Sequence, residues 1–114
     1  MGYSRAVRIG NIVEVAGTTA MDGDVPDGEG DVYAQTKFIL QKIERALAEA
    51  GSSLSDVIRT RMFITDINRW EEAAKAHGEF FKTIKPASAM VQVAALIDER
   101  LLIEIEATAV LPNV

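Results

Sequence analysis

The chain contains no cysteine and a single histidine. Without cysteine it cannot form a disulfide, use a thiolate nucleophile or hold a metal through sulfur. One histidine also excludes a zinc site built from several histidines of the same chain, and nothing in the sequence calls for a cofactor. A long uninterrupted apolar run and a basic leader are both missing, so we expect a soluble, cytoplasmic protein that does not enter a membrane.

Basic residues are scattered along the chain and are fewer than the acidic residues. The chain has 12 lysines and arginines against 17 acidic residues, which gives a formal net charge of -5. A protein that binds nucleic-acid backbones normally carries a basic stripe, so we expect no nucleic-acid partner. Hydrophobic residues at 48% and charged residues at 25% are ordinary for a globular protein. A length of 114 residues predicts one domain over residues 1–114.

The first thirty residues predict a hairpin followed by a loop. Residues 7–9 and 12–16 form two short apolar runs separated by Gly10-Asn11, a pair suited to a tight turn. Residues 17–30 are rich in glycine and acidic side chains and contain a proline. Such composition is typical of a loop, and the acidic positions do not follow the alternate spacing of a calcium-binding loop.

Two amphipathic segments predict helices. Asp31 is a suitable N-cap for the first helix, which continues with apolar residues at helical spacing until Gly51. The second helix is predicted to begin at Asn68, with Glu71 completing a capping box, and to end before Pro86. Its predicted buried side carries Trp70, Ala73, Ala74, His77, Phe81 and Ile84.

Three further segments, residues 58–65, 87–95 and 101–111, alternate with the period of two that is typical of strands. In the last segment all odd positions are apolar, while the even positions include Glu104 and Glu106. We assign the more apolar set of each strand to the face covered by the helices. The opposite, open face is then predicted to gather Arg59, Arg61, Phe63, Ser88, Met90, Gln92, Glu104 and Glu106.

The predicted order of elements is β-β-α-β-α-β-β, an α+β fold with two helices packed on one face of a mixed sheet. The pattern leaves two alternatives for the open face. It can remain in contact with water, as in many antiparallel sheets, or it can pack against further copies of the chain.

Several short segments, in this order and spacing, resemble one known family: Gly2-Tyr3-Ser4, Gly17 after the second strand, residues 61–66, Lys85-Pro86-Ala87 and residues 104–107. Together they resemble the reactive-intermediate deaminase (Rid, YjgF-like) family, whose members are often labelled endoribonuclease L-PSP or translation inhibitor. The resemblance covers nearly the whole chain, and it is carried by the order and spacing of the segments.

The resemblance implies a chorismate-mutase-like fold assembled as a homotrimer, with a central barrel of sheets and three ligand clefts between subunits. The best-known members hydrolyse 2-imino acids to 2-keto acids and ammonia without cofactor or metal. In these proteins an arginine holds the substrate carboxylate through a bidentate fork, and a glutamate positions the attacking water. The implied partner is therefore a small-molecule metabolite.

Residue by residue, the family's cleft tyrosine corresponds to Tyr3, its loop glycine to Gly17 and its water-positioning glutamate to Glu104. The arginine after the proline is replaced by Ser88, and the cysteine two positions later by Met90, both of which we expect to line the cleft. The asparagine of the second helix is replaced by Ala74. Since serine offers one neutral hydrogen bond in place of two charge-assisted ones, the sequence does not favour classical 2-imino acid deamination.

Two residues admit alternative interpretations. Arg61 either replaces the missing arginine as an anchor for the substrate or neutralises Glu104 or Glu106 on the open face. His77, on the apolar side of the second helix, is interpreted as a packed, hydrogen-bonded histidine.

Three functions follow from these residues. The first is hydrolytic deamination of a small imine or enamine, with Glu104 orienting water. The second is binding of a small metabolite without turnover, in which case the chain is not an enzyme. Endoribonuclease activity has the least support, because the chain is acidic and lacks a pair of histidines.

Overall fold

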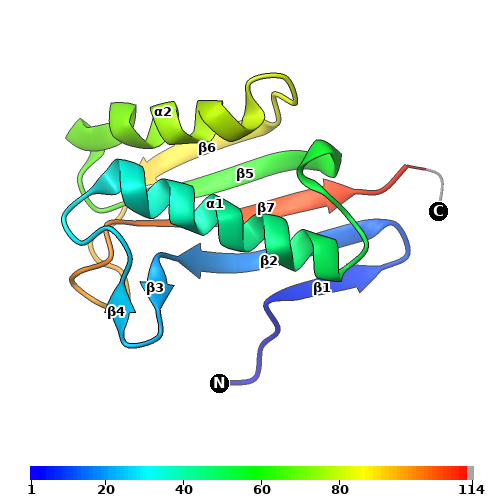
Figure 1. Cartoon of the computed structure of the whole chain (residues 1–114), viewed down its shortest axis with the longest axis horizontal. Helices are drawn as coiled ribbons and strands as arrows, with labels where there is room; N and C mark the ends of the chain where they lie inside the picture. Colours follow the sequence, from blue (N-terminus) through cyan, green and yellow to red (C-terminus); the bar gives the residue numbers. More distant parts are fainter. Residues whose placement is uncertain (113–114) are drawn as a thin grey trace.

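The computed structural model describes residues 1–112 and consists of a five-stranded sheet with two helices on one face (Figure 1). The strands lie in the order β1-β2-β7-β5-β6, with β5 and β6 parallel and the other neighbours antiparallel. The predicted α+β fold and order of elements are confirmed. Residues 113 and 114 of the predicted domain lie outside the described residues. The main elements are β1 (Ala6–Ile9), β2 (Ile12–Thr19), α1 (Val32–Glu49), β5 (Val57–Ile64), α2 (Trp70–Phe81), β6 (Ala87–Gln92) and β7 (Ile103–Val110).

The predicted hairpin forms, but the predicted loop is partly wrong. Gly10 has a φ of +60°, the left-handed conformation that a two-residue hairpin turn requires. Strand β2 continues past residue 16, because Thr18 and Thr19 pair with Ile105 and Glu104 of β7. The glycine-rich segment that follows contains a small separate hairpin of β3 (Met21–Asp22) and β4 (Val25–Pro26).

Helix α1 begins and ends where the sequence predicts. The Asp31 side chain accepts a hydrogen bond from the backbone N–H of Ala34 at 3.0 Å, and Gly51 follows the helix with a φ of +83°. Within residues 1–112, neither helix is long and apolar enough to cross a membrane.

The start of the second helix differs from the prediction. Asp66, rather than Asn68, caps this segment, and a 3-10 turn at Ile67–Arg69 precedes α2, so the predicted capping box does not form. Trp70, expected in the core, is 50% exposed because it occupies the first position of the helix. Ala73 and Phe81 are buried as predicted.

The core lies between the sheet and the two helices. All odd positions of the predicted last strand, from Leu101 to Leu111, are buried, which confirms its alternation. In β5, Thr60, Met62 and Ile64 face the helices as predicted. Ile58 was assigned to the same face but is 53% exposed, because the pairing with β7 shifts between Val57 and Arg59 and Val57 is buried instead.

Strand β6 faces opposite to the prediction. Thr60 of β5 pairs with Ser88, and Met62 pairs with Met90, so Ser88, Met90 and Gln92 lie on the helix side of the sheet. Ala87, Ala89 and Val91 share the open face with Arg59, Arg61 and Phe63. Each set in this edge strand combines one larger apolar residue, Met90 or Val91, with small or polar ones, so alternation alone does not fix which set faces the core.

Candidate functional site

Three of the predicted site residues line one cavity of about 300 Å³ at the edge of the open face. Tyr3 comes from the segment that precedes β1, Gly17 from β2, and Glu104 from the start of β7. The complete lining is Met1, Tyr3, Arg5, Ala16, Gly17, Thr19, Ile97 and Glu104. Gly17 and Glu104 are far apart in the sequence and are brought together by the pairing of β2 with β7.

The carboxylate of Glu104 lies directly over the backbone of Gly17. A Cβ built on Gly17 would be 2.6 Å from Oε2 of Glu104 and 3.0 Å from its Cδ. Gly17 lies where the β2–β7 pairing shifts between Val15 and Thr18, a β-bulge. The absence of a side chain at this position therefore makes the space that the carboxylate occupies.

Arg5 fixes the bulge and also lines the cavity. Its Nη2 donates hydrogen bonds to Oγ1 of Thr18 at 2.7 Å and to the carbonyl oxygen of Gly17 at 3.2 Å. The guanidinium carbon lies 5.8 Å from the ring centroid of Tyr3, a cation–π distance. Sequence reasoning missed Arg5, because its role depends on a bulge that is created by pairing with a strand almost ninety residues later.

Glu104 is a half-buried carboxylate that is available to a ligand. Within residues 1–112 no side chain forms an ion pair with it or donates a hydrogen bond to it. A carboxylate in this setting can accept a proton from a water molecule held against a bound electrophile. The described part of the chain contains no group of three or more histidine, aspartate or glutamate side chains placed to hold a metal ion.

Arg61 is not brought to Glu104. Its Nη1 lies 3.4 Å from Oε1 of Glu106 across β5 and β7, and the two side chains are 44% and 36% exposed. Both residues line a separate hollow of about 370 Å³ on the open face, together with Glu14. Of the two interpretations of Arg61, the geometry fits the ion pair with Glu106.

Ser88 and Met90 lie away from this cavity, and Ser88 belongs to a chain of hydrogen bonds that the sequence did not predict. Its Oγ is 2.7 Å from Oγ1 of the buried Thr60, which is in turn 2.9 Å from Nε2 of His77. The His77 ring packs on Phe81 with centroids 4.6 Å apart, and burial lowers the pKa of His77. His77 is therefore packed and hydrogen-bonded, as predicted.

Glu104 and Ser88 cannot touch the same small molecule within one chain. Glu104 pairs with Phe63 on the open face, whereas Ser88 pairs with Thr60 on the helix face, and β5 lies between their strands. A cleft that uses both side chains therefore needs two chains.

Comparison with known proteins agrees with this architecture. Residues 1–111 match the family described as Endoribonuclease L-PSP. The crystal structure of Rv2704 from Mycobacterium tuberculosis, a member of the YjgF/YER057c/UK114 family, has a TM-score of 0.87 and 51% identity, covering 96% of this chain and 86% of that one. The YjgF gene product from E. coli has a TM-score of 0.85 and 30% identity, covering 96% of this chain and 87% of that one. The Streptomyces coelicolor protein SCO2049 is 40% identical over 108 residues, which span 95% of this chain and 81% of that protein.

Proposed function

Since this chain belongs to the Endoribonuclease L-PSP family of Rid and YjgF-like proteins, we propose that it hydrolyses a small imine or enamine to a carbonyl compound and ammonia. The reaction takes place at the cavity of Tyr3, Gly17 and Glu104. The observation that carries this proposal is the Glu104 carboxylate, held over a glycine in a cavity large enough for a small metabolite and not paired with any side chain of residues 1–112.

Glu104 acts as the general base in this proposal. Its carboxylate takes a proton from a water molecule while the water oxygen bonds to the imine carbon, and the C=N electron pair moves to nitrogen. The nitrogen takes one proton from solvent, which gives the carbinolamine, and a second proton from the Glu104 carboxyl. The hydroxyl proton then passes to solvent as the carbonyl forms, the C–N bond breaks and ammonia leaves. Imine and water are thereby converted to carbonyl compound and ammonia, with no oxidant or reductant. An enamine enters the same sequence after protonation at carbon.

The working form is proposed to be a homotrimer with its ligand clefts between subunits. The opposite orientations of Glu104 and Ser88 support this, because only neighbouring chains can bring them to one cleft. The open face also carries apolar side chains that are about half exposed in the single chain, a condition that favours self-association. These side chains are Val7, Ile12 and Val91, together with the more exposed Ile9.

The proposed substrate lacks a carboxylate. Ser88 takes the place of the family's arginine, and its hydroxyl is already hydrogen-bonded to Thr60 and lies 3.3 Å from the carbonyl oxygen of Pro86. A neutral hydroxyl cannot form the two charge-assisted bonds that a guanidinium gives a carboxylate. We therefore propose neutral imines as substrates, in place of classical 2-imino acids.

The test uses two sources of imine: an amine oxidase, which releases neutral imines, and an amino-acid oxidase, which releases 2-imino acids. We expect the wild-type protein to accelerate ammonia release from the neutral imine more than from the imino acid. We expect Ser88→Arg to gain activity on the imino acid, and Glu104→Gln to lose activity on both.

Failure to accelerate either reaction contradicts the proposal. Thermal stabilisation by a metabolite, without any effect on the rates, supports the alternative of a metabolite-binding protein. Ribonuclease activity is not proposed, because the chain has a net charge of -5 and one histidine.

A further inference from the structure

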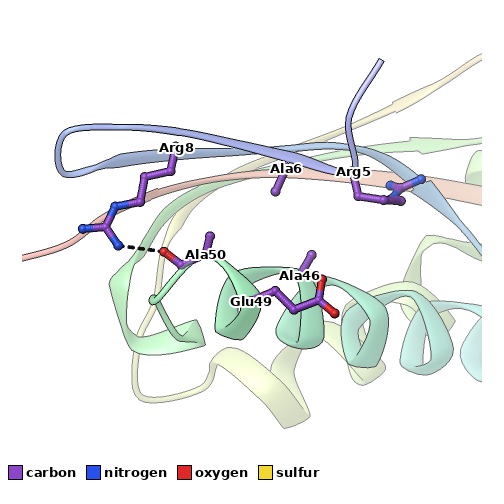
Figure 2. A pocket seen from close by; sticks show the side chains of 6 residues that line it. All are labelled: Arg5, Ala6, Arg8, Ala46, Glu49 and Ala50. Atoms are coloured by element: carbon purple, nitrogen blue, oxygen red, sulfur yellow. Dashed lines mark hydrogen bonds between the residues drawn. The ribbon is translucent and has the colours of Figure 1, made fainter. Parts of the chain in front are cut away.

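A second cavity, of about 330 Å³, lies between β1 and the end of α1 (Figure 2). Figure 2 shows Arg8 and Arg5 toward opposite ends of it, with Glu49 on the helix side between them. Three alanines, Ala6, Ala46 and Ala50, form its apolar wall. A smaller hollow of about 160 Å³ shares Arg5, Ala46 and Glu49 with it and adds Lys42 and Arg45. We call the two hollows together the β1–α1 groove.

The groove collects positive charge in an acidic protein. Four of the 12 basic residues of the chain line it, although the net charge is -5. Arg8 has a structural role, because it donates hydrogen bonds to the carbonyl oxygens of Ala50 at 2.7 Å and Gly10 at 2.9 Å. It thus caps the carbonyl end of α1 and compensates the negative end of the helix dipole.

Within the described residues 1–112, the side chains of the other three cations, Arg5, Lys42 and Arg45, form no ion pair. Lys42 donates to the carbonyl oxygens of Thr19 and Met21 at 2.8 and 3.0 Å, and Arg5 likewise binds neutral oxygens. The ion pairs among residues 1–112 are Arg61–Glu106, Arg69–Glu72 and Arg100–Asp98, none of them in the groove.

The charges of these cations act on one another. Burial lowers the pKa of the Lys42 ammonium, the neighbouring Arg5 and Arg45 lower it further, and Asp22 acts in the opposite direction. Gathering like charges around a half-buried ammonium is unfavourable in the empty protein, and an anion in the groove removes this cost.

We propose that the β1–α1 groove binds a phosphate group, either free or as a phosphate monoester, at Arg5, Lys42 and Arg45. Three cations and the Glu49 carboxylate give this part of the groove a net charge of +2, which a phosphate dianion neutralises. Guanidinium groups match phosphate oxygens through paired N–H donors, and the lysine adds a compact charge. The alanine-lined part has room for the apolar body of an ester. The groove shares Arg5 with the cavity of Glu104, but Glu104 does not line the groove, and phosphate binding there does not depend on the proposed hydrolysis.

Arg45 is the residue to test, because it is exposed and its side chain forms no hydrogen bond or ion pair within residues 1–112. Arg5 is unsuitable, since it also fixes the bulge at Gly17. Lys82, an exposed cation that follows α2, provides a matched control that removes the same charge elsewhere.

Isothermal titration calorimetry at constant ionic strength, with inorganic phosphate and with phenyl phosphate, tests the site. We expect saturable binding of one ligand per chain, weakened about ten-fold or more in Arg45→Ala and abolished in Arg45→Glu. Lys82→Ala and Glu104→Gln are expected to bind as the wild type does. Tighter binding of phenyl phosphate would assign the groove to an ester, and equal binding would assign it to free phosphate.

Three results would overturn the proposal. They are the absence of saturable binding to the wild type, equal weakening by Arg45→Ala and Lys82→Ala, and loss of binding in Glu104→Gln, which would place the anion in the other cavity. Because this titration does not measure ammonia release, its failure is distinguishable from failure of the proposed hydrolysis.

Discussion

Gly17 and Glu104 are matched to each other: the glycine has no side chain at the point where the glutamate places its carboxylate. The 2.6 Å that would separate a Cβ on Gly17 from Oε2 of Glu104 is shorter than any stable contact between these atoms. Gly17 is not among the glycines with positive φ, so space rather than backbone conformation requires glycine here. The relationship ties two positions of the sequence, 87 residues apart, to the cavity proposed for the hydrolysis.

Gly17→Ala tests this relationship. The added methyl group displaces the end of the flexible Glu104 side chain, so we expect a loss of less than about 1 kcal/mol in the free energy of unfolding but a large loss of ammonia release. Gly78→Ala is the matched control. Its Cβ would meet nothing within 4 Å, and we expect a gain of about 0.5–1 kcal/mol from the better helix former, with activity unchanged. Equal activity in the two variants would contradict the role given to Gly17.

Glu104→Gln preserves the shape of the side chain and removes its basicity. We expect the rate of imine hydrolysis to fall by about 100-fold or more while the urea unfolding midpoint hardly changes. Glu106→Gln, two residues further along the same face, serves as the control. It breaks the exposed ion pair with Arg61 and is expected to cost at most about 1 kcal/mol, with little effect on the rate. A similar loss of rate in Glu104→Gln and Glu106→Gln would contradict the role of Glu104 as a base, because any loss of negative charge from the open face of the sheet would then have the same effect.

Thr60→Val removes the middle of the hydrogen-bonded chain from His77 to Ser88. Thr60 is fully buried, so the change leaves Nε2 of His77 without its partner, and we expect destabilisation of about 1–3 kcal/mol in urea unfolding. Thr60→Ser keeps the hydroxyl and is expected to lose less. If valine and serine have the same effect, the hydrogen bonds contribute nothing to stability.

His77 makes stability depend on pH. Burial lowers its pKa in the folded protein, whereas in the unfolded chain it titrates near 6.5. The neutral, buried His77 therefore contributes fully to the free energy of unfolding above about pH 6.5. This contribution is lost as the pH falls through the lowered pKa of the folded state, because the unfolded state then binds more protons. We expect the free energy of unfolding to decrease from about pH 7.5 to about pH 5, and less steeply in His77→Phe. Asp98, whose pKa Arg100 lowers to about 2, titrates below this range. The same slope in both proteins would contradict the prediction.

The sequence predicted the fold where the alternation is strong and failed where it is weak. In the last strand, Ile103 and Ile105 lie on one side and Glu104 and Glu106 on the other. Because the two sides differ so strongly in polarity, only the isoleucine side can face the helices. In strand β6 each side carries one larger apolar residue, Met90 or Val91, beside small or polar ones. Its orientation therefore follows from parallel pairing with β5, which the sequence alone does not reveal. Ile58 was misplaced because a bulge changes the phase of alternation within a strand.

The candidate site was predictable in part. Tyr3, Gly17 and Glu104 were identified by their correspondence to a family, and the structure brings them to one cavity. Arg5 was missed, because its partners are backbone oxygens that come together only when the bulge forms. The link from Ser88 to His77 was missed because the wrong face had been assigned to Ser88.

The central claim is that a complete cleft forms only where two chains meet, and the molar mass in solution tests it most directly. Light scattering over a dilution series, with the folded state monitored by circular dichroism, is expected to give about 37 kDa, three times the 12.4 kDa of one chain. A mass near 12.4 kDa for a folded protein at every concentration would contradict the account, because Glu104 and Ser88 of a single chain face opposite sides of the sheet.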